Sequence, residues 1–160
     1  VRLGRAAVPT FYTKEAAKEI RIGKAATLRE GAKADGGYAD ITIIATGIMV
    51  SEAMQAAEEL AAEHGIEARV IDMHTIKPLD AEAIVKAAEE TGAIVTAEEH
   101  SVIGGLGSAV AEVVTTHCPV KMYMVGQQDT FGESGKPDEL KKKYGMTKDD
   151  IVKGVLTLRK

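Results

Sequence analysis

The most polar of the predicted strand ends, Glu98-Glu99-His100, directly follows the apolar run Ala93–Ala97. Two acids and a histidine could carry out acid–base chemistry or bind a metal ion weakly. No second histidine or cysteine stands beside them at the spacing of metal ligands. We therefore favour the alternative that these residues form a charged loop, which either caps the following helix or faces a partner.

A glycine-rich run, Gly104-Gly105-Leu106-Gly107-Ser108, stands shortly after these polar residues and opens a predicted helix. The amide groups and the dipole at such a helix start could hold an anion. The spacing is not that of the GxGxxG dinucleotide motif, and no acidic residue stands at the expected distance on a second strand. We therefore expect these glycines to serve tight turning and close packing against a neighbouring subunit.

The remaining candidates for chemistry are histidines and the single cysteine. His74 could be a ligand or a base, but beside Thr75 in a loop it is more typical of a hydrogen-bonded structural residue. His117 and Cys118 are adjacent at a helix end, where neighbouring side chains rarely face each other, so a Cys/His nucleophile is disfavoured. A lone cysteine forms no internal disulfide, which favours a reduced, cytoplasmic setting.

The composition indicates one globular domain. The chain has 160 residues, of which 45% are hydrophobic and 28% charged, enough to bury a core. The net charge is −4, and the densest basic run, Lys141–Lys143, stands beside two acids, so we expect no nucleic-acid partner. No apolar run reaches membrane-spanning length, so we expect no membrane partner. The first residue is Val1 rather than methionine, and we suspect a fragment of something larger.

Apolar runs and helical periodicities alternate after residue 40. We expect strands at residues 41–46, 68–73, 93–97 and 120–125, and helices at about 51–64, 81–91, 107–116, 137–144 and 148–158. Ser51, Asp80 and Thr147 are the expected N-caps, the last with Asp150 in the capping-box position. Gly65 and Gly92 are expected to end their helices.

Single helices between strands require right-handed crossovers and a parallel sheet covered on both faces. Residues 21–30 look like one more strand, and the helix-free link after it favours an antiparallel edge strand. Residues 1–20 look like a linker that enters the domain. Open parallel sheets bind ligands at the carboxyl ends of their strands. We therefore expect any site near residues 47–49, 73–75, 98–100 and 126–128.

Four stretches together resemble a known family. They are Val70–Asp80, Ala93–His100, Gly104–Val110 and Tyr144–Ile151. These stretches are similar to the last domain of the transketolase superfamily. The sequence His74–Pro78 and its surroundings look most like transketolase, especially the short form whose two halves are separate polypeptides. The beta subunits of 2-oxoacid dehydrogenases, which dock a partner protein, and deoxyxylulose-phosphate synthase remain the alternatives. A third interpretation is an independent anion-binding module that uses the glycine-rich turn.

The resemblance implies a fold and a domain division. The implied fold is α/β, a three-layer α/β/α sandwich on a five-stranded mixed sheet ordered 1-3-2-4-5, with strand 1 antiparallel. Residues 1–20 would be the end of a preceding pyrimidine-binding domain and a linker, and residues 21–160 the transketolase C-terminal domain. The full enzyme would transfer a two-carbon ketol unit between sugar phosphates, and this domain would support dimerisation and the active-site entrance. Its expected partners are the other transketolase domains or subunit, and the parent enzyme is expected to be a homodimer.

The resemblance also implies where the cofactor lies. Thiamine diphosphate and magnesium sit between two other domains of the family, which supply a Gly-Asp-Gly…Asn metal-binding stretch and an activating glutamate. The order Asp35-Gly36-Gly37 is wrong for that stretch. We therefore expect no catalytic residue, no metal ligand and no cofactor bound by this chain alone.

Some residues of the chain are nevertheless expected near the active site of the parent enzyme. Arg5 matches the family's arginine that holds the substrate phosphate, a task suited to a bidentate guanidinium. A further set of residues is expected at the active-site mouth or in an interface loop. These residues are Glu99, His100, Gly104, Gly105 and Gly107.

Overall fold

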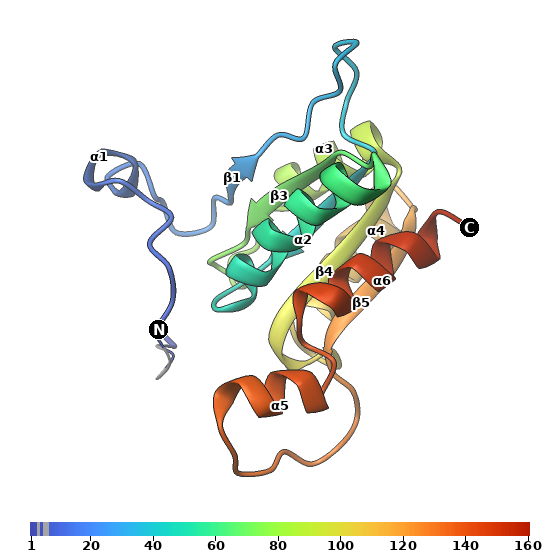
Figure 1. Cartoon of the computed structure of the whole chain (residues 1–160). Helices are drawn as coiled ribbons and strands as arrows, with labels where there is room; N and C mark the ends of the chain where they lie inside the picture. The colour runs from blue at the N-terminus through green and yellow to red at the C-terminus, as the bar shows by residue number, and fades with distance from the viewer. Residues whose placement is uncertain (3, 5–6) are drawn as a thin grey trace.

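The computed structural model describes residues 1–2, 4 and 7–160 (Figure 1), so the prediction for Arg5 lies outside the described residues. Strands and helices alternate strictly between residues 41 and 127. In chain order the elements are α1 (Lys14–Ala17), β1 (Ala26–Arg29), β2 (Ile41–Ala45), α2 (Met49–His64), β3 (Ala68–Asp72), α3 (Ala81–Thr91), β4 (Ala93–Ser101), α4 (Leu106–His117), β5 (Lys121–Gln127), α5 (Pro137–Lys143) and α6 (Lys148–Leu158).

The five strands form one mixed sheet in the order β1-β3-β2-β4-β5, which confirms the predicted order. Strand β1 runs antiparallel to β3, while β2 is parallel to both β3 and β4 and β4 is parallel to β5. After β2 the chain crosses to β3 on one side of it. Later it adds β4 on the other side of β2 and continues outward to β5. The carboxyl ends of β2 and β4 therefore flank the point at which the strand order reverses, where open α/β sheets leave a crevice.

Helices cover both faces of the sheet (Figure 1), as its fully buried central strands require. Side chains of a strand alternate between faces, and in β2 Ile43 packs with α2 and α6 whereas Ile44 packs with α3 and α4. The result is the predicted three-layer sandwich. Burial of its aliphatic side chains is the main source of stability.

Several predicted boundaries shift. The strand predicted over residues 21–30 is shorter, because only Ala26–Arg29 forms β1. Ser51 is not the N-cap of α2, because the helix begins two residues earlier, at Met49, with Ile48 as a cap that makes no side-chain bond. Strand β4 continues to Ser101, because its pairing with β5 extends that far. The polar run at residues 98–100 is therefore strand rather than loop.

Other local predictions are confirmed. The carboxylate of Asp80 accepts a 3.3 Å hydrogen bond from the amide of Ala83 and caps α3. Gly92 follows α3 with a φ of 68°, a left-handed conformation that favours glycine. The carboxylate of Asp150 accepts a 3.0 Å hydrogen bond from the amide of Thr147 at the start of α6. Within the described residues, no helix is long and apolar enough to cross a membrane.

Candidate functional site

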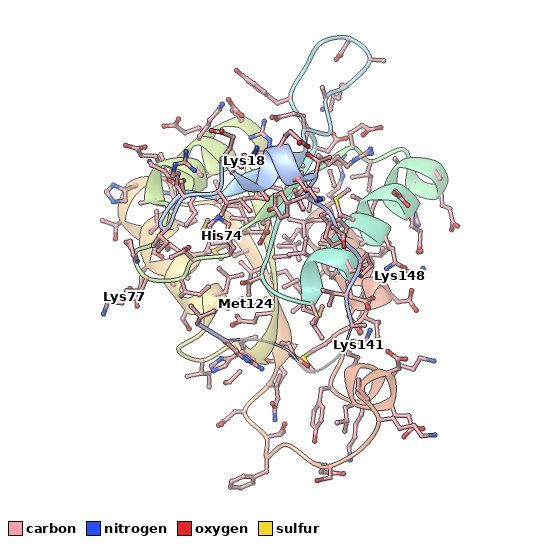
Figure 2. All side chains as sticks on the ribbon, turned by 90° about the vertical axis from the view of Figure 1, so that its left-hand side faces the viewer. Lys18, His74, Lys77, Met124, Lys141 and Lys148 are labelled. Carbon is pink, nitrogen blue, oxygen red and sulfur yellow. The ribbon has the colours of Figure 1, made fainter. Side chains whose placement is uncertain are left out.

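A cleft of about 810 Å³ opens at the carboxyl ends of the parallel strands. Three of the four predicted strand ends line it: Gly47 and Ile48 after β2, His74 after β3, and residues 98–100 of β4. Described residues near the N-terminus, among them Arg2 and Phe11, form its other side. Figure 2 looks onto the molecule from the side on which α1 lies in Figure 1, and His74 lies near the middle of this view.

Glu98 is the most deeply buried acid at this cleft, with only 1% of its surface exposed. Its two carboxylate oxygens accept hydrogen bonds of 2.7 Å each from the amides of Leu106 and Gly107, the first residues of α4. These amides have no partner inside the helix, and a negative charge there also suits the helix dipole. The anion that the glycine-rich turn can hold is therefore supplied by the chain itself. This observation confirms the capping role that the sequence favours.

The glycines of this turn allow the close approach. A Cβ atom on Gly105 would lie 1.9 Å from Oε2 of Glu98, so only glycine leaves room for the carboxylate. Gly104 has a φ of 75°, which confirms the predicted tight turn. Gly107 is buried, and a Cβ built on it would lie 2.9 Å from the sulfur of Met124 on β5. Gly107 thus packs inside its own chain, and packing of the glycine-rich turn against a neighbouring subunit stays a prediction.

Burial raises the pKa of the Glu98 carboxyl, and the two amide hydrogen bonds offset this effect only in part. Because the folded pKa lies above the unfolded value of about 4.3, the folded chain holds the proton to a higher pH than the unfolded chain. The stability contributed by this group is therefore greatest below about pH 4 and falls as the pH rises through the raised pKa.

We expect the wild-type chain to lose stability relative to Glu98→Gln between pH 4 and pH 7, by about 1 kcal/mol for each unit by which the pKa is raised. Urea denaturation of both proteins at matched pH values measures the difference. The glutamine variant is the control, because its side chain has the same size and does not titrate. A wild-type stability that rises relative to the variant over this range would contradict the assigned direction.

His100 and Glu99 lie at the end of β4 and both line the cleft, together with Gly104 and Gly105. Nδ1 of His100 donates a 2.8 Å hydrogen bond to the carbonyl of Ser101 and lies 3.9 Å from Oε2 of Glu98. The carbonyl of Glu99 accepts a 3.0 Å hydrogen bond from Nη1 of Arg2. Gly107 does not line the cleft among the described residues. The roles predicted for these five positions stay predictions.

The end of β3 brings together groups that sequence reasoning missed. Tyr12 donates a 2.6 Å hydrogen bond to Oδ2 of Asp72, which is only 7% exposed. Burial raises the pKa of Asp72, while the bond from Tyr12 and the nearby His74 lower it again. Nδ1 of His74 shares a 2.9 Å hydrogen bond with Thr75, as predicted. Its Nε2 atom is buried without a hydrogen-bond partner among the described residues.

The groups that could hold a metal ion lie elsewhere. Among the described residues, metal-ligand atoms gather only at Glu59, Glu63 and His64, at the exposed carboxyl end of α2, and Lys148 already bonds to Glu59. The amide of Gly37 bonds to Asp35 in a surface turn. Neither group lines the cleft described above. Several polar groups of the cleft are already hydrogen-bonded, among them Glu98 to two amides and Glu99 to Arg2.

Comparisons with known proteins find a family and close relatives. The family model described as "Transketolase, C-terminal domain" matches residues 23–151. The chain is 54% identical over 84% of its length to the 6-deoxy-6-sulfo-D-fructose transketolase subunit SqwH of Clostridium sp., covering 39% of that protein. It is 47% identical over 98% of its length to one of the subunits of the apulose-4-phosphate transketolase of Phocaeicola vulgatus, covering 47% of that polypeptide.

A solved structure is similar along almost the whole chain. The structure described as "Split gene transketolase, inactive beta4 tetramer" superimposes with a TM-score of 0.88 at 47% identity, covering 98% of this chain and 48% of that one. A 1-deoxy-D-xylulose-5-phosphate synthase of Desulforudis audaxviator is 44% identical over 84% of this chain, which covers 20% of it. The chain thus spans about half the length, or less, of the proteins it matches.

Proposed function

Because the chain belongs to the transketolase C-terminal domain family, we propose that it is the last domain of one subunit of a two-subunit transketolase. The whole enzyme transfers a two-carbon ketol unit between sugar phosphates. The observation that carries this proposal is the similarity over 98% of the chain to a protein named as a transketolase subunit, of which the chain covers 47%. A subunit of that size leaves room for one more domain ahead of this one.

We propose that residues 1–20 are the end of a preceding pyrimidine-binding domain with its linker, and that residues 21–160 are the C-terminal domain. The family model supports this division, since its match begins at residue 23. The fold supports it as well, because α1 is the only element of the described residues before β1. In this arrangement the domain supports dimerisation and shapes the active-site mouth, with Glu99 and His100 at the edge of the cleft.

Thiamine diphosphate and magnesium belong, in this proposal, to the other domains of the enzyme. Asp35 and its following glycines form a surface turn, and Glu59 with its neighbours lies apart from the cleft. We therefore assign no catalytic residue and no cofactor ligand to this chain. The cofactor supplies the carbanion chemistry when it is bound elsewhere in the assembly. A cytoplasmic location is part of the proposal and is supported by the single cysteine, Cys118.

The test is reconstitution of the whole enzyme. The full-length subunit that contains this chain, mixed with its partner subunit, thiamine diphosphate and magnesium, is expected to transfer two carbons from a ketose phosphate to an aldose phosphate. The isolated chain of 160 residues is expected to show no transfer and no calorimetric binding of the cofactor. Tight cofactor binding by the isolated chain would contradict the assignment, and so would an inactive reconstituted pair with every ketose phosphate tried.

A second candidate is favoured by the similarity to 1-deoxy-D-xylulose-5-phosphate synthase. The same reconstituted pair distinguishes the two activities by product, because only the synthase forms 1-deoxy-D-xylulose 5-phosphate. Apulose 4-phosphate and 6-deoxy-6-sulfo-D-fructose, the compounds named in the two transketolase relatives, belong on the substrate panel. Transfer between sugars without the deoxy sugar product supports the transketolase.

A further inference from the structure

The loop between β5 and α5, residues 128–136, carries a large apolar side chain into solvent. Phe131 is 97% exposed, and a phenylalanine side chain offers about 200 Å² of surface for burial. Figure 1 shows this loop and α5 projecting below the body of the domain. Because burial of apolar surface is favourable, the loop is a candidate for contact with another part of the whole enzyme.

Hydrogen bonds at both ends of the loop hold its backbone in this projecting position. At the β5 end, Nε2 of Gln127 donates a 2.7 Å hydrogen bond to the carbonyl of Thr130. At the α5 end, the hydroxyl of Tyr144 donates a 3.2 Å hydrogen bond to the carbonyl of Phe131 itself. A side chain on a backbone that is already held loses less conformational entropy on docking, which is typical of an interface anchor.

Helix α5, which follows the loop, is fastened to the body of the domain through Glu52 on α2. Nζ of Lys141 lies 2.7 Å from Oε1 of Glu52, and both side chains are largely buried. The other oxygen of Glu52 accepts a 2.9 Å hydrogen bond from the amide of Lys148, at the start of α6. One carboxylate thus joins three helices, and the loop begins and ends on anchored elements.

The chain enters the domain at the edge of the sheet from which this loop leaves. Strand β1 runs antiparallel to β3, so its first residue, Ala26, lies opposite Asp72 at the carboxyl end of β3. Ahead of β1, a Cβ built on Gly23 would lie 2.9 Å from Pro78, in the loop after β3. The loop of Phe131 follows the carboxyl end of β5, four strand spacings or about 20 Å across the sheet. Whatever precedes residue 23 is therefore tethered to the same edge.

We propose that the loop 128–136 docks onto the domain that precedes this one in the same subunit, and that Phe131 is the anchor received by an apolar pocket there. This proposal rests on the proposed function, which places such a domain ahead of residue 21. More than half of the Phocaeicola vulgatus polypeptide lies outside its match to this chain. A domain as large as this chain has a radius of gyration of about 15 Å, so a domain tethered at β1 reaches across the sheet edge to β5.

The exposed area argues against a second copy of the chain as the occupant. A stable dimer buries roughly 800 Å² on each partner, about four times what one phenylalanine provides. Every other residue of the loop is polar or glycine, so the loop adds little further apolar surface. A tethered domain needs much less area, because the linker keeps it at an effective concentration on the order of millimolar.

The test compares the full-length subunit, diluted until it is monomeric and without its partner subunit, with the chain of 160 residues. Hydroxyl-radical footprinting measures the exposure of single side chains. We expect oxidation of Phe131 to be about fivefold slower in the full-length subunit, because a docked anchor lies in a desolvated pocket. Tyr38 is the internal control. It is 59% exposed in the loop before β2, at the opposite edge of the sheet, and should be oxidised equally in both proteins.

A pair of variants gives a second readout. In the full-length subunit, Phe131→Ala is expected to make amide hydrogen exchange in residues 128–136 about tenfold faster, with exchange in β2 unchanged. Tyr38→Ala removes an exposed aromatic side chain from the other edge and should leave exchange in this loop unchanged. In the chain of 160 residues, Phe131→Ala should not change the urea midpoint, because an exposed side chain has little packing to lose.

Equal oxidation of Phe131 in the two proteins would overturn the proposal. Protection that appears only at concentrations where the subunit associates would assign the loop to a second copy, and protection only after addition of the partner subunit would assign it to that subunit. Either result would overturn the preceding domain as the occupant. These measurements need no transfer of sugars, so a failure of the proposed function is recognised separately in the reconstituted enzyme.

Discussion

Replacing Gly105 with alanine is expected to lower the free energy of unfolding by about 3 kcal/mol. The new Cβ would lie 1.9 Å from Oε2 of Glu98 and 2.5 Å from the carbonyl oxygen of Ser101. The carbonyl belongs to the backbone and cannot turn aside. The carboxylate can move only by giving up its hydrogen bonds to the amides of Leu106 and Gly107. The substitution therefore combines overpacking with the loss of buried hydrogen bonds.

Urea denaturation of the variant against Gly132→Ala measures this effect. Gly132 lies in the loop after β5, where the nearest atom to a built Cβ is Nε2 of Gln127 at 3.9 Å. The control makes the same change of side chain without a clash, so its stability should stay within about 0.5 kcal/mol of wild type. Equal stabilities of the two variants would show that the turn yields easily and that Glu98 is not held as described.

The strands and their order could be predicted because buried parallel strands have a clear local signature. β-branched residues on both faces indicate β2 and β3, and the helix-free link before residue 41 distinguishes the antiparallel edge strand from the others. The ends of elements follow from distant pairing instead. Ser101 is in β4 because Gln127 lies opposite it on β5, and no local pattern contains that information.

The starts of the helices are likewise only partly predictable from the local sequence. Ser51 has the composition of an N-cap, yet α2 begins at Met49 because the amides of Met49 and Val50 bond to the carbonyls of Thr46 and Gly47. Asp80 and Thr147 were predictable as N-caps, the second because Asp150 stands three residues later in the capping-box position. The start of α2 is the exception, because it is set by the path of the backbone after β2. That path depends on how β2 is placed in the sheet.

The position of the cleft could be predicted from the sequence, but the contacts inside it could not. Strand order alone puts the ends of β2, β3 and β4 together. The bond between Tyr12 and Asp72 joins residues far apart in the sequence, and a tyrosine in a linker gives no sign of its partner. An acid that ends the apolar run of β3 was the one available signal. The glycine spacing likewise indicated an anion site without revealing that Glu98 fills it.

Gly31→Ala is the second substitution with a large expected effect, because it would disturb the packing of the chain after the edge strand β1 against β3. Gly31 follows β1, is buried, and has a φ of 61°. A Cβ there would lie 2.4 Å from the carbonyl oxygen of Ala68 and 2.9 Å from the amide nitrogen of Arg69, both backbone atoms at the start of β3. We expect a loss of about 3 kcal/mol, the sum of left-handed strain and a clash that no rotamer relieves.

Gly36→Ala separates the two contributions. Gly36 has a φ of 83°, but no atom lies within 4 Å of a Cβ built on it, so only the conformational cost of about 1 kcal/mol applies. The difference between the two variants in thermal or urea denaturation therefore measures the clash with β3. Faster hydrogen exchange confined to Ala26–Arg29 in Gly31→Ala would place the damage at the edge strand. Equal losses in both variants would mean that β1 shifts freely along β3, and that the antiparallel edge is not fixed by this contact.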